Sequence, residues 1–210
     1  MNRFFALMMA AVMVITAANA QTSKQIRKAQ KEAKKEARQL RKDGWKVAPG
    51  MLPLDTQLER TYLMQYELDG NGENKFFIGD AMSPGGTYDG AKMQATELAK
   101  IDIAGKIQSL ITALTESTQG NKQITQEQAV TLIETVQSSK SLIEQRLGRC
   151  ITAIEYYKPL PNKTVQVRVV LALNTKTALE NAKAVIEEQL REKGEYLHEE
   201  LNTIWAQYGL

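Results

Sequence analysis

Three short segments rich in apolar residues predict β-strands. They lie at residues 75–83, 150–158 and 164–173. In the first segment Gly79, Ala81 and Ser83 share one face, and side chains this small allow a helix to pack closely. In the third segment valine and leucine alternate with Gln166 and Arg168, which predicts a strand with one face in the core and the other in solvent.

Apolar residues at helical spacing occupy most of the remaining chain. The longest predicted helix runs from Ala91 to about Ser117 and is entered from the glycine-rich loop Pro84 to Gly90. Thr125 and Gln128 form a capping-box sequence that predicts the start of another helix, weakened around Ser138-Ser139. Further helices are expected near residues 55–67 and 178–190, and past Gly194 a last helix carries Tyr196, Leu197, Leu201, Ile204 and Trp205.

This order of elements predicts an α+β fold, in which a small antiparallel three-stranded sheet packs with long helices and a basic N-terminal helix precedes it. We divide the chain into a signal peptide (1–20), a basic helical arm (21–43), a connector and helix (44–74), the α+β domain (75–193) and a C-terminal helix (194–210).

The first twenty residues are typical of a cleaved signal peptide. Arg3 supplies a positive charge, residues 4–17 carry none, and Ala18-Asn19-Ala20 is the pattern of small residues that signal peptidase accepts. An uncleaved anchor is the alternative, but the uncharged run is shorter than the roughly 20 residues that span a bilayer. We therefore expect export to the periplasm or outer membrane, a mature protein beginning at Gln21, and no transmembrane segment after cleavage. Nucleic acid is not an expected partner in that compartment.

The single cysteine limits the chemistry of the mature chain. Lipidation requires cysteine at the first mature position, where this chain has Gln21, so no lipid anchor of that kind is expected. Cys150 cannot form an intramolecular disulfide, and we expect it to be buried or to pair between chains. A nucleophilic pair with His198 is conceivable, although nothing in the sequence brings the two together.

The basic arm is the feature with most functional content. Residues 21–43 hold nine bases and three acids, whereas the rest of the mature chain is mildly acidic. The bases are Lys24, Arg27, Lys28, Lys31, Lys34, Lys35, Arg38, Arg41 and Lys42. They predict binding to an anionic envelope surface or to another envelope protein. The alternative is a solvated helix without a partner. The apolar stripe of this arm is mostly alanine, too weak for firm insertion into a membrane.

Residues 75–190 resemble the domain of small outer-membrane lipoproteins typified by the twenty-kilodalton lipoprotein, which is shared with the amino-terminal domain of flagellar assembly protein T. The matching stretches are Gly79-Asp80-Ala81, Ala95 to Ile107, Glu155-Tyr156-Tyr157 and Val165 to Leu173. The whole mature chain also resembles a set of exported proteins from Gram-negative bacteria. The resemblance implies an α+β envelope domain without catalytic residues, and this chain differs in lacking the lipid-bearing cysteine.

Metal and cofactor chemistry find little support in the sequence. His198 is the only histidine, which excludes multi-histidine zinc motifs and the repeated Glu-x-x-His of di-iron bundles, although Glu195 lies three residues before it. Residues 69–74 imitate a calcium loop with Asp80 at the twelfth place, but the sixth place lacks glycine and a plain turn is favoured. We expect no cofactor.

Two functions remain from the sequence. The first is a non-catalytic structural or binding module of the cell envelope. The alternative is an envelope hydrolase with a carboxylate site near Asp80 and Asp89, close to the loop that leads into the longest helix.

Overall fold

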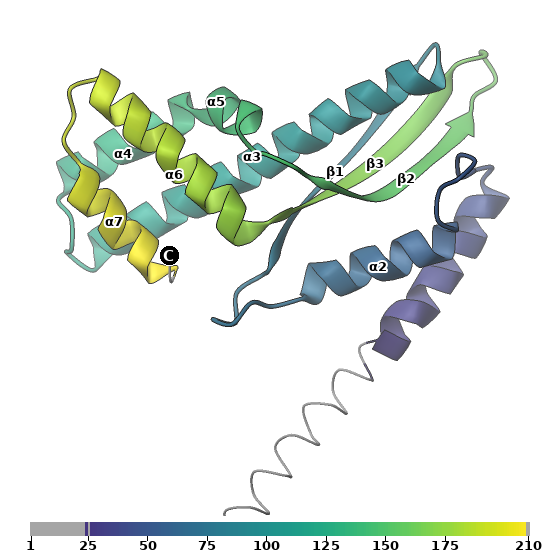
Figure 1. Cartoon of the computed structure of the whole chain (residues 1–210), viewed down its shortest axis with the longest axis horizontal. Helices are drawn as coiled ribbons and strands as arrows, with labels where there is room; N and C mark the ends of the chain where they lie inside the picture. The colour runs from purple at the N-terminus through teal and green to yellow at the C-terminus, as the bar shows by residue number, and fades with distance from the viewer. Residues whose placement is uncertain (1–23, 25, 209–210) are drawn as a thin grey trace, which may run out of the picture.

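The computed structural model describes residue 24 and residues 26–208, and the predicted signal peptide lies outside these residues. The fold is α+β, as predicted (Figure 1). Its sheet has three antiparallel strands in the order β1-β3-β2, where β1 is Phe76–Gly85, β2 is Ile151–Pro159 and β3 is Val165–Asn174. The predicted strands were right to within two residues at each end.

One face of the sheet is covered by α3, the longest helix, which runs over Tyr88–Gly120. Ala91, Ala95 and Ala99 of this helix are fully buried, and the predicted small-residue face of β1 lies against the helix. A Cβ atom at Gly79 would overlap the carbonyl oxygen of Ala99 and lie 2.7 Å from Ile103 Cγ1. Glycine at this position therefore sets how closely the helix and the strand approach.

The remaining C-terminal helices gather at the far end of α3 (Figure 1). They are α4 (Gln126–Ser138), α5 (Lys140–Gln145), α6 (Thr175–Glu192) and α7 (His198–Gln207). The capping box is confirmed, because Thr125 and Gln128 exchange side-chain and backbone hydrogen bonds. The predicted weakness is a real break at Ser139, whose hydroxyl donates to Thr135 O. Tyr196 and Leu197 were wrongly placed in the last helix, because both precede α7, and Tyr196 is 92% exposed.

The other face of the sheet is covered by α2 (Leu54–Tyr66) and by a helix over residues 26–42, here called the N-terminal helix (Figure 1). Ala33 and Ala37 are buried in a second core cluster with Leu54, Leu58 and side chains of β2 and β3. Both faces of β3 are thus covered. The expectation that Gln166 and Arg168 face solvent fails for Arg168, because a second helical layer lies over it.

Both outer edges of the sheet are partly occupied. On β2 the backbone of Lys46 exchanges two hydrogen bonds with Tyr157, and the buried side chain of Gln57 accepts from Glu155 N at 2.7 Å. On β1 the carboxylate of Asp102 accepts from Asp80 N at 3.1 Å, and Lys106 Nζ donates to Ile78 O at 2.6 Å. Edges covered in this way offer fewer free groups for pairing with another strand.

None of the helices in the described part of the chain combines the length and the apolar character needed to cross a bilayer.

Candidate functional site

The N-terminal helix presents its bases on the side opposite the sheet. At 3.6 residues per turn, the nine predicted bases fall within about 140° of the circumference, centred about 150° from Ala33. They extend along about 27 Å of helix. All nine are exposed, whereas Ala33 and Ala37 on the inner side are buried. We call the surface formed by Lys24, Arg27, Lys28, Lys31, Lys34, Lys35, Arg38, Arg41 and Lys42 the basic face.

Most charges of the basic face have no counter-charge within the described residues. Arg41 pairs with Asp55 across 3.1 Å, and no other base of the face forms an ion pair among the residues described. The middle of the face is a shallow hollow bordered by Lys31, Lys34, Lys35, Arg38, Gln39 and Lys42. Because most of these bases have no ion-pair partner among the described residues and the helix that carries them is packed against the body, they create a strong positive field on this side of the molecule.

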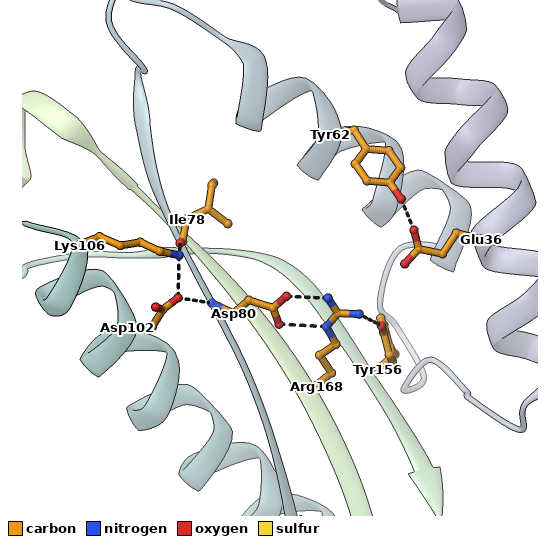
Figure 2. A network of polar contacts seen from close by, with 8 residues as sticks. All are labelled: Glu36, Tyr62, Ile78, Asp80, Asp102, Lys106, Tyr156 and Arg168. Carbon is orange, nitrogen blue, oxygen red and sulfur yellow. Dashed lines mark hydrogen bonds and ion pairs between the residues drawn. The ribbon is translucent and has the colours of Figure 1, made fainter. Parts of the chain in front are cut away.

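The inner side of the same helix contributes polar contacts to the body. Glu36 accepts a hydrogen bond from the hydroxyl of Tyr62 on α2 (Figure 2). Gln30 donates to Glu59 on α2 at 2.9 Å. Together with Ala33, these contacts give the helix a fixed orientation, so the basic face is held outward rather than carried on a loose arm.

Beneath the N-terminal helix lies a network centred on Arg168 of β3 (Figure 2). Its Nε and Nη2 donate to the two carboxylate oxygens of Asp80 at 2.9 and 2.5 Å, and its Nη1 donates to the hydroxyl of Tyr156 at 2.7 Å. Hydrogen bonding to Asp80 raises the pKa of Arg168 further above its usual range, although burial opposes it. Trp45 packs edge-on against Tyr156, with ring centroids 4.9 Å apart. The connector thus helps to hold the network.

A second pair continues this network along the edge of β1. Lys106 Nζ lies 2.8 Å from the carboxylate of Asp102, one turn earlier on α3. The same oxygen of Asp102 accepts from Asp80 N. Figure 2 shows the resulting chain from Lys106 through Asp102 and Asp80 to Arg168. Each carboxylate in it faces a cation, which is the arrangement expected for a structural ion-pair network.

On the α3 side of the sheet, Glu155 is a buried carboxylate. It accepts from the hydroxyl of Tyr88, and Lys92 Nζ lies 2.8 Å from it. Glu155 belongs to the Glu155-Tyr156-Tyr157 stretch of the family resemblance, and here it joins β2 to the start of α3. The hydroxyl of Tyr88 and the ammonium group of Lys92 stabilise the negative charge of this carboxylate, as burial of a charge requires.

The two carboxylates of the predicted hydrolase site lie in different surroundings. Asp80 is bound by Arg168, while Asp89 lies in the first turn of α3. There an acidic side chain interacts favourably with the helix dipole. Glu36 and Asp80 line one cavity, a pairing that the sequence did not suggest.

The structure also places the remaining candidates. Cys150 is half-buried before β2, and burial raises the pKa of its thiol, which lowers the thiolate fraction. His198 begins α7 with its side chain 69% exposed, as expected for a solvated residue, and its Nδ1 lies 3.1 Å from Glu187 Oε1. No hydrogen bond between described residues joins it to Cys150. Asp69 accepts from the backbone N–H groups of Asn71 and Glu73, which is the predicted turn.

Within residues 24 and 26–208, no three His, Cys, Asp or Glu side chains are grouped so that they could hold a metal ion. Comparison of the chain with models of protein families, with curated proteins and with solved structures finds no match. The resemblance to the twenty-kilodalton lipoprotein domain therefore stays a prediction. Charge and geometry are the remaining guides to function.

The tyrosine–carboxylate contacts predict a loss of stability at alkaline pH. Burial first, and then the hydrogen bond to Glu36, raises the pKa of Tyr62 above its ordinary value of about 10. The folded protein thus keeps this proton at pH values where the unfolded chain releases it. The contribution of Tyr62 to the free energy of unfolding is complete below about pH 10 and falls as the pH rises further.

Urea unfolding at pH values from 8 upward, to about 11, checks this expectation. We expect the decline of the wild type to become shallower in Tyr62→Phe. Tyr66→Phe, on the same helix but 73% exposed, is the matched control and should follow the wild type. Equal slopes for all three proteins would contradict the assignment.

Proposed function

We propose that this protein is a non-catalytic binding module of the cell envelope that attaches to an anionic, phosphate-bearing surface through the basic face of its N-terminal helix. The observation that carries the proposal is the set of nine exposed bases on one side of a helix whose opposite side is packed into the core. Export follows from the signal-peptide pattern of residues 1–20 and is part of the same proposal.

Electrostatics supply the energy of attachment in this proposal. A base close to an anionic membrane contributes about 1 kcal/mol, and the bases of one face act on the same surface. A helix that inserts usually carries tryptophan, phenylalanine or leucine on its membrane side. The only large apolar side chain of the N-terminal helix that is exposed among the described residues is Ile26, at 36%. The face is thus suited to adsorption onto charged headgroups rather than to insertion between lipid chains.

Fixed orientation is the second support for the proposal. Because Ala33 and Ala37 belong to the core, the bases point away from the body without an ordering step on binding. Side chains on a preformed surface lose less conformational freedom than those of a disordered arm. The body is then held at the surface with its sheet and cavities in one orientation.

Vesicle co-sedimentation tests the proposal. The mature chain, residues 21–210, is mixed with vesicles of phosphatidylcholine alone or of phosphatidylcholine with phosphatidylglycerol. We expect sedimentation with the phosphatidylglycerol vesicles and none with phosphatidylcholine. Failure to bind the anionic vesicles, or equal binding to both kinds, would refute attachment to phosphate headgroups. Amino-terminal sequencing of the protein recovered from cells tests export, with Gln21 expected as the first residue.

A further inference from the structure

A cavity of about 250 Å³ lies between the N-terminal helix, α2 and the sheet. At about 30 Å³ for each molecule of liquid water, it has room for about eight waters or for one ring-sized organic group. Its lining includes Glu36, Tyr62, Ile78, Asp80, Lys106 and Arg168. These six are labelled in Figure 2, where they surround the space between the Arg168 network and the Tyr62–Glu36 pair.

Hydrogen-bond donors line one part of the cavity. The guanidinium of Arg168 has five N–H groups, of which three are used by Asp80 and Tyr156. The other two have no partner among the described residues. Lys106 uses two of its three donors, on Asp102 and on Ile78 O. This part of the cavity can therefore donate further hydrogen bonds without breaking any that exist.

An acceptor lines the other part. Glu36 accepts from Tyr62 through one carboxylate oxygen, Oε2, and the other oxygen makes no hydrogen bond with a described residue. Glu36 comes from the N-terminal helix, whereas Arg168 comes from β3, so the donors and the acceptor belong to different layers of the fold. Apolar side chains of Leu58, Ile78 and Ile154 complete the lining.

The charges around the cavity limit what it can hold. Arg168 pairs with Asp80 and Lys106 pairs with Asp102, so both cations are already neutralised. A free anion would be repelled by the carboxylate of Glu36, and a free cation could not accept the unused hydrogen bonds of Arg168 and Lys106. A hydroxyl group donates and accepts at the same time. Neighbouring hydroxyls on one ring can thus accept from Arg168 and donate to Glu36 without adding a charge.

We infer that this cavity binds one neutral, hydroxyl-rich ring of the size of a single hexopyranose, with Arg168 and Lys106 as donors, Glu36 as acceptor and the apolar side chains against the carbon skeleton. The site is separate from the basic face and does not depend on attachment to a surface. Because Glu36 stands on the N-terminal helix, the bound ring also joins that helix to the sheet and opposes its undocking.

Methyl NMR of the mature chain tests the inference. The protein is titrated separately with glucose, galactose and mannose, and with alanine and inorganic phosphate as zwitterionic and anionic probes. We expect at least one hexose to give saturable shifts of the methyl groups of Ile78 and Ile154, and slower amide hydrogen exchange over residues 26–42. No saturable shift with any hexose overturns the inference, and so do shifts of these methyl groups with alanine or phosphate alone.

Variants locate the binding. Glu36→Gln removes the charge and replaces one of the two acceptor oxygens by an N–H donor, so it is expected to weaken hexose binding about 10-fold. Glu32→Gln, an exposed acid on the same helix, is the matched control and should bind like the wild type. If Glu36→Gln does not fold, Lys106→Met is compared with Lys100→Met in the same way. Equal affinities within the pair that is compared would overturn the assignment of the site.

Discussion

Gly79→Ala is expected to lower the free energy of unfolding by about 3 kcal/mol, the upper part of the usual range for overpacking. The added methyl group would overlap the backbone oxygen of Ala99 and lie 2.7 Å from Ile103 Cγ1. A carbonyl oxygen inside a helix cannot rotate away, so α3 would have to move from the sheet along part of its length. Urea unfolding monitored by circular dichroism measures the change.

Gly86→Ala is the matched control for this substitution. Gly86 lies in the short connection between β1 and α3, and a Cβ atom there meets no atom within 4 Å. Its stability should equal that of the wild type or rise slightly, because alanine restricts the unfolded chain. Similar losses for the two variants would show that the close approach at Gly79 does not determine the packing of α3.

The features that were predicted correctly from the sequence depend on residues that lie close together in the chain. The exchange of hydrogen bonds between Thr125 and Gln128 needs only residues three apart, and the small face of β1 is visible in Gly79 and Ala81 alone. The break at Ser139 likewise follows from two neighbouring serines. Strand and helix limits shifted by a few residues because the ends of elements depend on tertiary contacts.

The candidate cavity could not be predicted, because its parts are far apart in the chain. Arg168 and Asp80 are separated by 88 positions, and Tyr62 and Glu36 by 26. The alternation of apolar and polar residues around Arg168 is typical of a strand with one face in solvent, but the docking of the N-terminal helix, together with α2, covers that face (Figure 1). That docking uses Ala33 and Ala37, whose small side chains give a weak signal of burial in a highly charged segment.

The second large effect is expected from neutralising the centre of the basic face. The triple variant Lys31→Gln, Lys35→Gln and Arg38→Gln removes three charges that form no ion pair with described residues. At about 1 kcal/mol for each base, partition onto phosphatidylglycerol vesicles should fall about 100-fold. The fold should be retained, because all three side chains are exposed.

A control variant with the same change in net charge distinguishes the effect of the basic face on partition from the effect of the charge of the whole molecule. Arg149→Gln, Lys176→Gln and Arg191→Gln remove three exposed bases outside the N-terminal helix. We expect partition within a fewfold of the wild type. Substitution is preferable to deleting residues 21–43, since deletion would also uncover the core around Leu54 and Leu58. An equal loss in both triple variants would argue against a specific binding face.

The central claim is that charge on the basic face, rather than apolar contact, attaches the protein to an anionic surface. It is tested most directly by the partition of the mature chain onto phosphatidylglycerol vesicles as salt is raised to about 1 M, where the Debye length is about 3 Å. We expect the binding seen at low salt to be lost progressively and to disappear at the highest salt. Binding that persists unchanged in about 1 M salt would contradict it.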